Sequence, residues 1–370
     1  MRFTLARDQF ASALRRITPF ADSKSPIPIY RHVKLVVSGN QLKLTAANTT
    51  FDVTSTVTLE EAADNGHACV AADHFTGLVG SLRADQDVNI DFDDDGNLLV
   101  ASGHTKAVFP SMNSAFPVFD IAFPEAQIVV KAGELDRVLG LTRPAMGTDT
   151  DRMIFWGTAF RYERVGTLVA ACDGLLGVTC RLHEDKLTEF PAGIFPRSLC
   201  VRLRGLLKNT MGEIHISVTP AAVRLVAPDW TVTSKLVDGI FPETKHWDAR
   251  VVEQPIVCNA EELTAILARI DAATDLDSKA LKQRGALVNI QAGVMVIRDG
   301  GHTVTDQMNV TYDGADAIEF GLNTKHIRDA IDALDAQEIE LHFHDRNASM
   351  RVCARGEADD GFTTTPYRIN

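Results

Sequence analysis

The sequence predicts an α+β chain in which one structural unit, a pair of short helices packed on antiparallel sheets, occurs three times. Three observations lead to this prediction. Apolar residues recur at helical spacing in six short segments, the segments are separated by nearly constant intervals, and the stretches between them have the alternation and turn residues of strands. We therefore expect six repeated half-units, two in each of three similar domains.

Three of the helical segments share an apolar template at i, i+3, i+4 and i+7, which places four residues on one face of a helix. Each follows a short strand-like run, and successive copies are 125 and 128 residues apart. The template residues are Phe10, Ala13, Leu14 and Ile17 in the first copy, Leu135, Val138, Leu139 and Thr142 in the second, and Leu263, Ile266, Leu267 and Ile270 in the third.

A second set of three helices lies 64 or 65 residues after the first helix of each third. Its template residues are Phe75, Leu78, Val79 and Leu82, then Leu199, Arg202, Leu203 and Leu206, and finally Ile327, Ala330, Ile331 and Leu334. The half-unit is therefore a strand, a helix and a few antiparallel strands. Proline-bearing stretches near residues 125 and 253 predict domains at 1–125, 126–252 and 253–370.

The composition is that of an acidic protein with ordinary hydrophobic content. There are 49 acids against 37 Lys and Arg, and the net charge is −12, which argues against a protein that simply coats nucleic acid. The chain has neither an apolar run long enough to cross a membrane nor a hydrophobic signal core near its start. The six cysteines form no CxxC pair, so we expect buried, reduced thiols and a cytoplasmic location.

Residues 195–209 predict a helix that is basic on one face, with four cations and no acid. Its leucines fall on the opposite side. Cations on the other predicted helices repeat this pattern more weakly. One interpretation is a set of solvated helix faces, and the other is six equivalent helices that face a polyanion through phosphate contacts. The candidate DNA-facing residues are Arg7, His74, Arg83, Arg137, Arg197, Arg202, Arg204, Lys208, Lys325 and Arg328.

Three stretches resemble chemical sites, and we expect a structural role for each. The run DFDDDG at 91–96 begins like a calcium loop, but Ser102 stands where such a loop needs a glutamate, so a hairpin turn is favoured. His342 and His344 could form a metal pair, but we expect them to be surface histidines because no third ligand is evident. Asp173 precedes a glycine and is expected to be a turn residue.

No nucleotide-binding, hydrolase or zinc-protease motif occurs in the chain. We accordingly expect no catalytic residue, no bound metal and no cofactor.

Several motifs resemble the bacterial sliding clamp family, the β subunit of the replicative DNA polymerase. The most specific is TSKLVDGIFPE at 233–243, and others are LVAACDGLLGVTCRL at 168–182 and GLNTKHIRDAIDAL at 321–334. SPIPIYRHVKL near the start and TPYRIN at the end also resemble family segments. The resemblance runs along the full length and implies the DNA clamp fold.

The resemblance implies a ring of two chains, joined head to tail, that encircles duplex DNA without sequence preference. Such a ring is not an enzyme, and it holds the DNA polymerase III alpha subunit, the clamp loader and other proteins with clamp-binding motifs. These partners insert a short peptide into a cleft. The implied cleft residues are Arg152, Phe155, Ala170, Cys172, Gly174, Gly177, Pro242, His246, Trp247, Pro366, Tyr367, Arg368 and Ile369. The resemblance adds Lys24 as a DNA-facing residue and Lys106, Ala107 and Phe109 as interface residues.

The function expected from the sequence is a DNA sliding clamp that increases polymerase processivity. An alternative is a regulator with the clamp fold that binds partner peptides but encloses DNA poorly. Ala107 at the implied interface and Met153 and Ile154 in an implied DNA-facing loop motivate this alternative. An enzyme on the same scaffold is a third possibility, but it would need a cluster of titratable groups that the sequence does not display.

Overall fold

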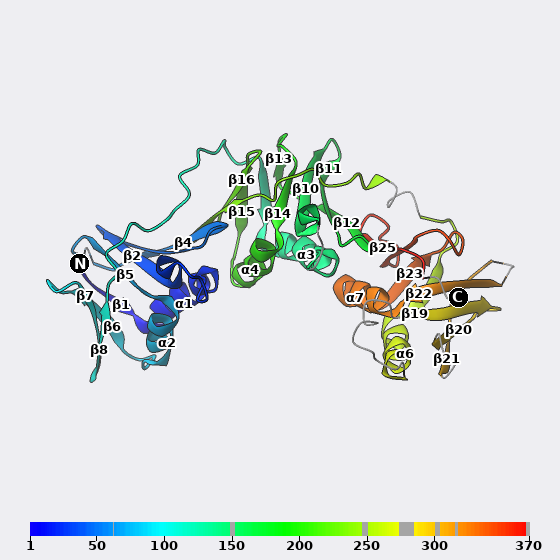
Figure 1. Ribbon diagram of the computed structural model, residues 1–370, viewed down its shortest axis with the longest axis horizontal. Helices are drawn as coiled ribbons and strands as arrows, with labels where there is room; N and C mark the ends of the chain where they lie inside the picture. Colours follow the sequence, from blue (N-terminus) through cyan, green and yellow to red (C-terminus); the bar gives the residue numbers. More distant parts are fainter. Residues whose placement is uncertain are drawn as a thin grey trace. The chain divides into compact units, whose positions relative to one another are not determined.

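The computed structural model describes residues 1–61, 63–148, 152–245, 251–273, 285–299, 304–314 and 317–367. The chain forms two compact units, whose elements are labelled in Figure 1. The N-terminal unit comprises Met1–Gly133, Glu184–Pro191 and Val201–Leu236. The C-terminal unit comprises Glu134–His183, Ala192–Cys200 and Val237–Asn370.

The N-terminal unit contains two antiparallel sheets. The smaller has the order β1 (Arg2–Ala6), β6 (Asp87–Phe92), β7 (Asn97–Ser102) and β8 (Thr105–Pro110). The larger has nine strands in the order β13 (Lys186–Leu187), β9 (Ile128–Lys131), β15 (Glu213–Val218), β16 (Ala222–Val226), β17 (Trp230–Lys235), β4 (Phe51–Thr58), β3 (Gln41–Ala47), β2 (His32–Ser38) and β5 (Gly66–Ala71).

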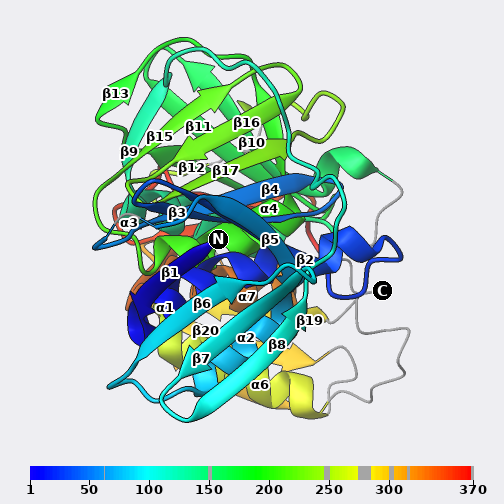
Figure 2. The same ribbon diagram turned by 90° about the vertical axis from the view of Figure 1, so that its left-hand side faces the viewer.

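Helices α1 (Arg7–Ile17) and α2 (Ala72–Ser81) pack against each other and against these sheets. Figure 2 shows both helices beside the four-stranded sheet. The ring of Phe10 makes edge contacts with Phe3 at 5.9 Å and with Phe75 at 5.6 Å between centroids. These aromatic pairs join strand β1 to both helices, so the core of this unit forms where the helices meet the sheets.

The C-terminal unit also has a large and a small antiparallel sheet. The large sheet has the order β14 (Gly193–Pro196), β10 (Gly157–Glu163), β11 (Gly166–Cys172), β12 (Leu176–Leu182), β25 (Gly361–Thr364), β24 (Met350–Ala354), β23 (Glu338–His342) and β18 (Ile256–Asn259). The small sheet has the order β21 (Thr305–Asn309), β20 (Val294–Asp299), β19 (Gly285–Gln291) and β22 (Ile318–Asn323).

Helices α6 (Ala260–Ala273) and α7 (Thr324–Leu334) contact both sheets of the C-terminal unit. The remaining predicted helices are α3 (Ala132–Thr142) and α4 (Arg197–Leu207). Each of these six helices begins at the residue after a strand ends, so the predicted strand–helix order of the half-unit is confirmed. The apolar template is buried at nearly every position, and the exceptions are the half-buried Leu78, Arg202 and Leu334.

Both large sheets continue across a predicted domain boundary. Strand β17 pairs with β4, where Val232 lies opposite Val53, and β12 pairs with β25, where Val178 lies opposite Phe362. Neighbouring thirds of the chain therefore share sheets through backbone hydrogen bonds. The division into domains 1–125, 126–252 and 253–370 stays a prediction.

Two turn predictions are confirmed. In the 91–96 segment, β6 and β7 form a hairpin, Gly96 has φ +84°, and the Asp93 carboxylate accepts the Asn97 backbone N–H at 2.7 Å. Asp173 accepts the backbone N–H groups of Leu175 and Leu176, both at 2.8 Å. The Asp173 contact with Leu175 is an Asx turn, and the Asp93 carboxylate bridges its hairpin turn to the first residue of β7.

The prediction of six free, buried cysteines is also confirmed. Over the described ranges, no helix combines the length and apolar character needed to cross a membrane.

Candidate DNA-contact and peptide-contact surfaces

Helix α4 has the two faces that the sequence predicts. Leu199, Leu203 and Leu206 are buried, whereas Lys208 is exposed and Arg204 is half-buried. Val201 and Gly205 are also exposed on the polar side, so that side is open to a ligand. The segment has no acid, whereas each of the other predicted helices contains at least one.

Arg197 is the first residue of α4 and is held by carbonyl groups. Its Nη1 donates to the backbone oxygen of Met146 at 2.8 Å and to that of Arg143 at 3.4 Å. Burial, and then the charge of Arg143, lower the pKa of the guanidinium. Carbonyl oxygens orient this cation without neutralising it, so it keeps its charge for an anion.

Arg202 is fixed within the N-terminal unit. Its Nε donates to the backbone oxygen of Pro19 at 2.7 Å, and its Cζ lies 5.3 Å from the centroid of the Phe51 ring. With Arg15 it lines an open hollow of about 460 Å³, which we call the basic hollow. The other lining residues are Thr18, Pro19, Ala21, Ser23, Asp73 and Thr76. Two guanidinium groups and three hydroxyl groups can bind a phosphate there, and the single carboxylate of Asp73 leaves the lining with a net positive charge.

Several other candidate cations already contact carboxylates. The guanidinium of Arg137 bonds Glu134 at 2.8 Å, the Arg181 carbonyl at 2.6 Å and the carboxylate of Asp360. The hydrogen bond to Glu134 and the charge of Asp360 raise its pKa. These contacts tie α3 to strands of the same unit.

Helix α7 has a similar arrangement. Arg328 donates to Asp271 at 2.9 Å, and Lys325 is paired with Asp329 one turn further along the helix. The positive charges of α7 are thus balanced locally.

The candidates of the first third of the chain differ in exposure. Arg7 is largely buried, and its guanidinium bonds Asp8 at 2.6 Å and the backbone oxygen of Gly80. Arg83 is exposed and pairs with Asp85 at 2.8 Å. Lys24 and His74 are exposed. Lys24 is the residue after Ser23, which lines the basic hollow. Arg7 is buried and paired, and it connects α1 to α2. Lys24, in contrast, is exposed enough to contact a phosphate.

Part of the predicted peptide cleft is assembled around Phe155, at the end of the short 3₁₀ helix η4 (Met153–Phe155). Its buried ring makes an edge contact with Phe241 at 6.3 Å, and the Cζ of Arg152 lies 5.8 Å from its centroid. Pro242 follows Phe241 and is half-buried. The structure therefore brings Arg152, Phe155 and Pro242 into one neighbourhood.

The β11–β12 turn brings together a second group of predicted cleft residues. Cys172 lies opposite Gly177 in the ladder, and the Gly174 backbone N–H donates to the Cys172 sulfur at 3.1 Å. Gly174 has φ +100°, a conformation that favours glycine. Burial raises the pKa of the Cys172 thiol to about 11, so this thiol stays protonated and unreactive.

The C-terminal segment contacts this turn. The backbone N–H of Thr365 donates to the carbonyl of Leu175 at 3.0 Å, which places Pro366 next to the turn. The backbone N–H of Tyr367 donates to the carbonyl of Gly321 at 3.3 Å. A Cβ at Gly285 would lie only 1.8 Å from the Tyr367 ring, so the ring packs directly on the glycine backbone.

A cavity of about 290 Å³ adjoins these groups and was not predicted from the sequence. Ala170 is the predicted cleft residue that lines it, and Phe241 links it to Phe155. The other lining residues are Ala159, Phe160, Arg161, Leu168, Ala192, Gly193, Ile194, Gly239, Ile240, Glu243 and Thr244. Ile240 is 90% exposed, which is unusual for an aliphatic side chain beside a cavity. The only sequence signal was the apolar pair within GIFPE.

Four predicted cleft residues, His246, Trp247, Arg368 and Ile369, lie outside the described residues. Their place in the cleft stays a prediction.

The predicted interface residues lie on β8, an edge strand of the small N-terminal sheet. Lys106 is exposed, and Ala107 and Phe109 are half-buried. The Phe109 ring makes an edge contact with Phe75 at 5.3 Å between centroids. Val108, which lies between Ala107 and Phe109 in the strand, is 62% exposed. An edge strand with an exposed valine offers both backbone groups and apolar surface to another chain.

One expectation about chemical sites is wrong. His342 was expected to be a surface histidine, but it is only 1% exposed, whereas His344 is exposed. The two residues do not form a pair because strand β23 ends at His342.

Comparison with known proteins identifies the fold. Residues 1–120 match the family model described as DNA polymerase III beta subunit, N-terminal domain. A beta sliding clamp from Pseudomonas putida is 23% identical over 377 residues, and one from Proteus mirabilis is 24% identical over 375 residues. Both alignments cover all of this chain and all of the relative.

Solved structures agree. The DNA polymerase III subunit beta of Pseudomonas aeruginosa superposes with a TM-score of 0.92 at 23% identity, with full coverage of both chains. A beta sliding clamp from Caulobacter crescentus, described with polyethylene glycol at a putative beta-motif tethering region, gives 0.88 at 20% identity with the same coverage. This chain therefore has the DNA clamp fold along its whole length.

Proposed function

We propose that this chain is a member of the bacterial sliding clamp family and closes with a second copy of itself into a ring that encircles duplex DNA. The observation that carries the proposal is the sixfold recurrence of one half-unit. Each of the helices α1, α2, α3, α4, α6 and α7 directly follows a strand, and the whole chain matches the clamp fold. A chain built of similar repeats can form a ring that presents similar surfaces all around the duplex, so no rotation of the DNA inside the ring is preferred.

In such a ring, DNA is retained by topology rather than by affinity. Lys and Arg contacts with phosphates are independent of sequence and exchange readily, so they permit sliding. Arg197, Lys208, Lys24 and the basic hollow of the N-terminal unit supply such contacts. The chain as a whole carries a net charge of −12, so its other surfaces do not attract the duplex strongly in this proposal.

The chain acts without catalysis in this proposal, as a mobile attachment point that increases the processivity of DNA synthesis in the cytoplasm. Loading onto closed DNA needs a separate ATP-driven partner, the clamp loader, because the sequence has no nucleotide-binding motif. The DNA polymerase III alpha subunit and other proteins then share one docking site.

The two copies join head to tail through the edge of β8. Val108 contributes exposed apolar surface, Lys106 contributes a charge, and Phe109 supports the strand from beneath through Phe75. A head-to-tail contact forms a closed ring only when its rotation is compatible with closure, here after two copies.

Partner peptides dock in the C-terminal unit, in a cleft built by Phe155, Pro242, the β11–β12 turn and the C-terminal segment. His246, Trp247, Arg368 and Ile369 complete this cleft in the proposal. Aromatic and aliphatic walls with a few polar groups are typical of sites for short peptides. The exposed Leu175 and Met153 extend the apolar surface beside it.

Retention on circular and linear DNA tests the proposal. Loaded protein should remain on a nicked circle through gel filtration and should leave within seconds once the circle is cut, because a ring slides off a free end. Sedimentation should show a species of twice the 40.4 kDa chain mass. A monomer that binds partner peptides but leaves circles and linear DNA equally fast would instead identify a clamp-fold regulator.

A further inference from the structure

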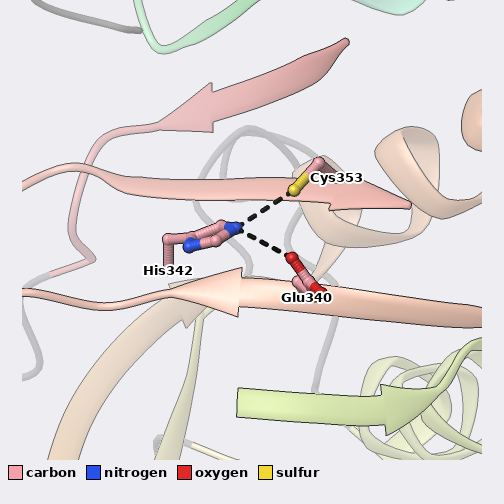
Figure 3. Close-up of side chains that lie close together, drawn as sticks. All are labelled: Glu340, His342 and Cys353. Atoms are coloured by element: carbon pink, nitrogen blue, oxygen red, sulfur yellow. Dashed lines mark hydrogen bonds and ion pairs between the residues drawn. The ribbon is translucent and has the colours of Figure 1, made fainter. Parts of the chain in front are cut away.

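Three side chains that the proposed clamp function does not use meet on one face of the large C-terminal sheet (Figure 3). Glu340 and His342 lie on β23, and Cys353 lies on the neighbouring β24. Glu340 is directly opposite Cys353 in the ladder, and His342 is two residues further along. Strand periodicity therefore points all three side chains to the same side.

We propose that this Glu340–His342–Cys353 cluster binds a divalent metal ion of the zinc class. Nε2 of His342 is 3.1 Å from Sγ of Cys353 and 3.3 Å from Oε2 of Glu340. A tetrahedral zinc ion holds sulfur, nitrogen and oxygen ligands about 3.4–3.6 Å from one another. The side chains thus need to separate by only a few tenths of an ångström to admit the ion.

Neighbouring groups orient the proposed ligands. The backbone N–H of Gly356 donates to Oε1 of Glu340 at 3.2 Å, which directs Oε2 toward His342. His342 and Cys353 are buried, and the Glu340 side chain is 15% exposed. An ion therefore enters the cluster from the side of Glu340. A water molecule can occupy the fourth coordination position on that side.

The chemistry of the three ligands selects the class of metal. A thiolate and an imidazole favour zinc, cobalt or copper over magnesium and calcium, which prefer oxygen ligands. A carboxylate and a thiolate together balance a doubly charged ion, so the ion and its three ligands carry no net charge. Arg351 lies opposite His342, and its guanidinium is directed at Thr179, Ala358 and Asp359 by bonds of 2.8–3.2 Å.

Metal binding would be coupled to the segment that precedes β18. The backbone N–H of Val252 donates to Nδ1 of His342 at 3.2 Å, so the ring proton of the neutral imidazole lies on Nε2, where it faces Cys353 and Glu340. An ion on Nε2 moves this proton to Nδ1 and releases the thiol proton to solvent. Nδ1 then no longer accepts from Val252, and this anchor of the 251–255 segment is lost.

Cobalt substitution of the full chain tests the proposal independently of ring formation. Chelator-treated protein titrated with Co²⁺ should develop thiolate-to-cobalt absorption in the near ultraviolet that saturates at one equivalent and disappears when Zn²⁺ is added. The Cys353→Ser variant should lose this absorption. Cys258→Ser is the matched control, because Cys258 is buried in β18 of the same sheet but pairs with Ile339 and faces away from Glu340.

The Glu340→Gln variant gives a second readout that keeps the strand residues buried and the side-chain volume constant. It should weaken cobalt binding by about tenfold or more while the circular dichroism spectrum stays unchanged. Absence of the absorption in the unaltered chain, or its persistence in Cys353→Ser, would overturn the proposal. Either result would leave the cluster as a hydrogen-bonded anchor for Val252.

Discussion

Helices α4 and α7 occupy the same place in two repeats of the half-unit and differ in how their charges are partnered. Leu199 of α4 and Ile327 of α7 are equivalent template positions, and both are fully buried. Arg197 and Lys325 precede them by two residues. Arg197 donates to the carbonyls of Arg143 and Met146, whereas Lys325 is paired with Asp329.

The difference teaches that packing and charge are separable properties of the repeat. The apolar face has to fill the same space between sheets in each copy, so the residues at its template positions stay apolar in most copies. The polar face has no such constraint, and even the charge sign changes, because Asp73 of α2 is at the position that Arg197 occupies in α4. To decide which helices can contact DNA, the partners of each cation therefore have to be considered along with the number of cations.

The largest expected effect concerns the shared property. Leu199→Ala and Ile327→Ala each remove most of a fully buried aliphatic side chain, and we expect each to reduce the free energy of unfolding by about 2–5 kcal/mol. Urea denaturation followed by circular dichroism measures the change. Similar losses at the two sites would support equivalent packing, and a loss below about 1 kcal/mol at either site would contradict it.

A smaller effect should separate the two helices. Replacing Arg197 by alanine removes a cation that contacts carbonyls, and we expect the slope of log K against log salt for duplex DNA to fall by about 0.9. The matched variant, Lys325→Ala, removes a cation paired with Asp329, so the slope should change little. Fluorescence anisotropy with labelled duplex at several salt concentrations measures both slopes.

The Asp329→Asn variant is the control that makes α7 resemble α4. It leaves Lys325 without its carboxylate partner, and DNA affinity should rise modestly at low salt. Equal losses in Arg197→Ala and Lys325→Ala would show that partnering does not decide which cations meet DNA.

The sequence predicted the elements of the fold well because their signals are local. Periodic apolar residues identified the six helices α1, α2, α3, α4, α6 and α7, and Gly96 and Gly174 marked turns that need positive φ. The charge partners could not be predicted in this way. Arg137 meets Asp360, which is 223 positions away, and Arg328 meets Asp271, which is 57 positions away. Such ion pairs depend on the tertiary fold, and no characteristic separation in the sequence identifies them.

The error at His342 has the same origin. His342 was expected at the surface because the sequence shows no third metal ligand near it, but the backbone N–H of Val252, 90 positions away, donates to its ring. The apolar cavity beside Ala170 was missed because its walls come from separate strands and from the loop that contains Phe241. Local pattern therefore predicts which face of an element is buried, and long-range packing decides which polar groups it brings together.

The smallest predicted effect is a pH dependence that α7 has and α4 lacks. His326 of α7 is 7% exposed, and its Nδ1 lies 3.0 Å from Oγ1 of Thr364. Burial lowers its pKa in the folded state, with smaller opposing contributions from Asp173 and Asp329. The residue at the equivalent position of α4 is Ser198, which does not titrate.

The sign follows from proton linkage. Below the pKa of about 6.5 that histidine has when unfolded, the unfolded chain binds a proton that the folded chain does not, so stability falls as the pH decreases through that value. Burial lowers the pKa of His342 as well, which adds to the same trend. The slope of unfolding free energy against pH between about 7.5 and 5.5 should therefore be smaller in His326→Gln but not zero. An unchanged slope would mean that protonated His326 is accommodated in the folded state, and α7 would then be no more sensitive to pH than α4.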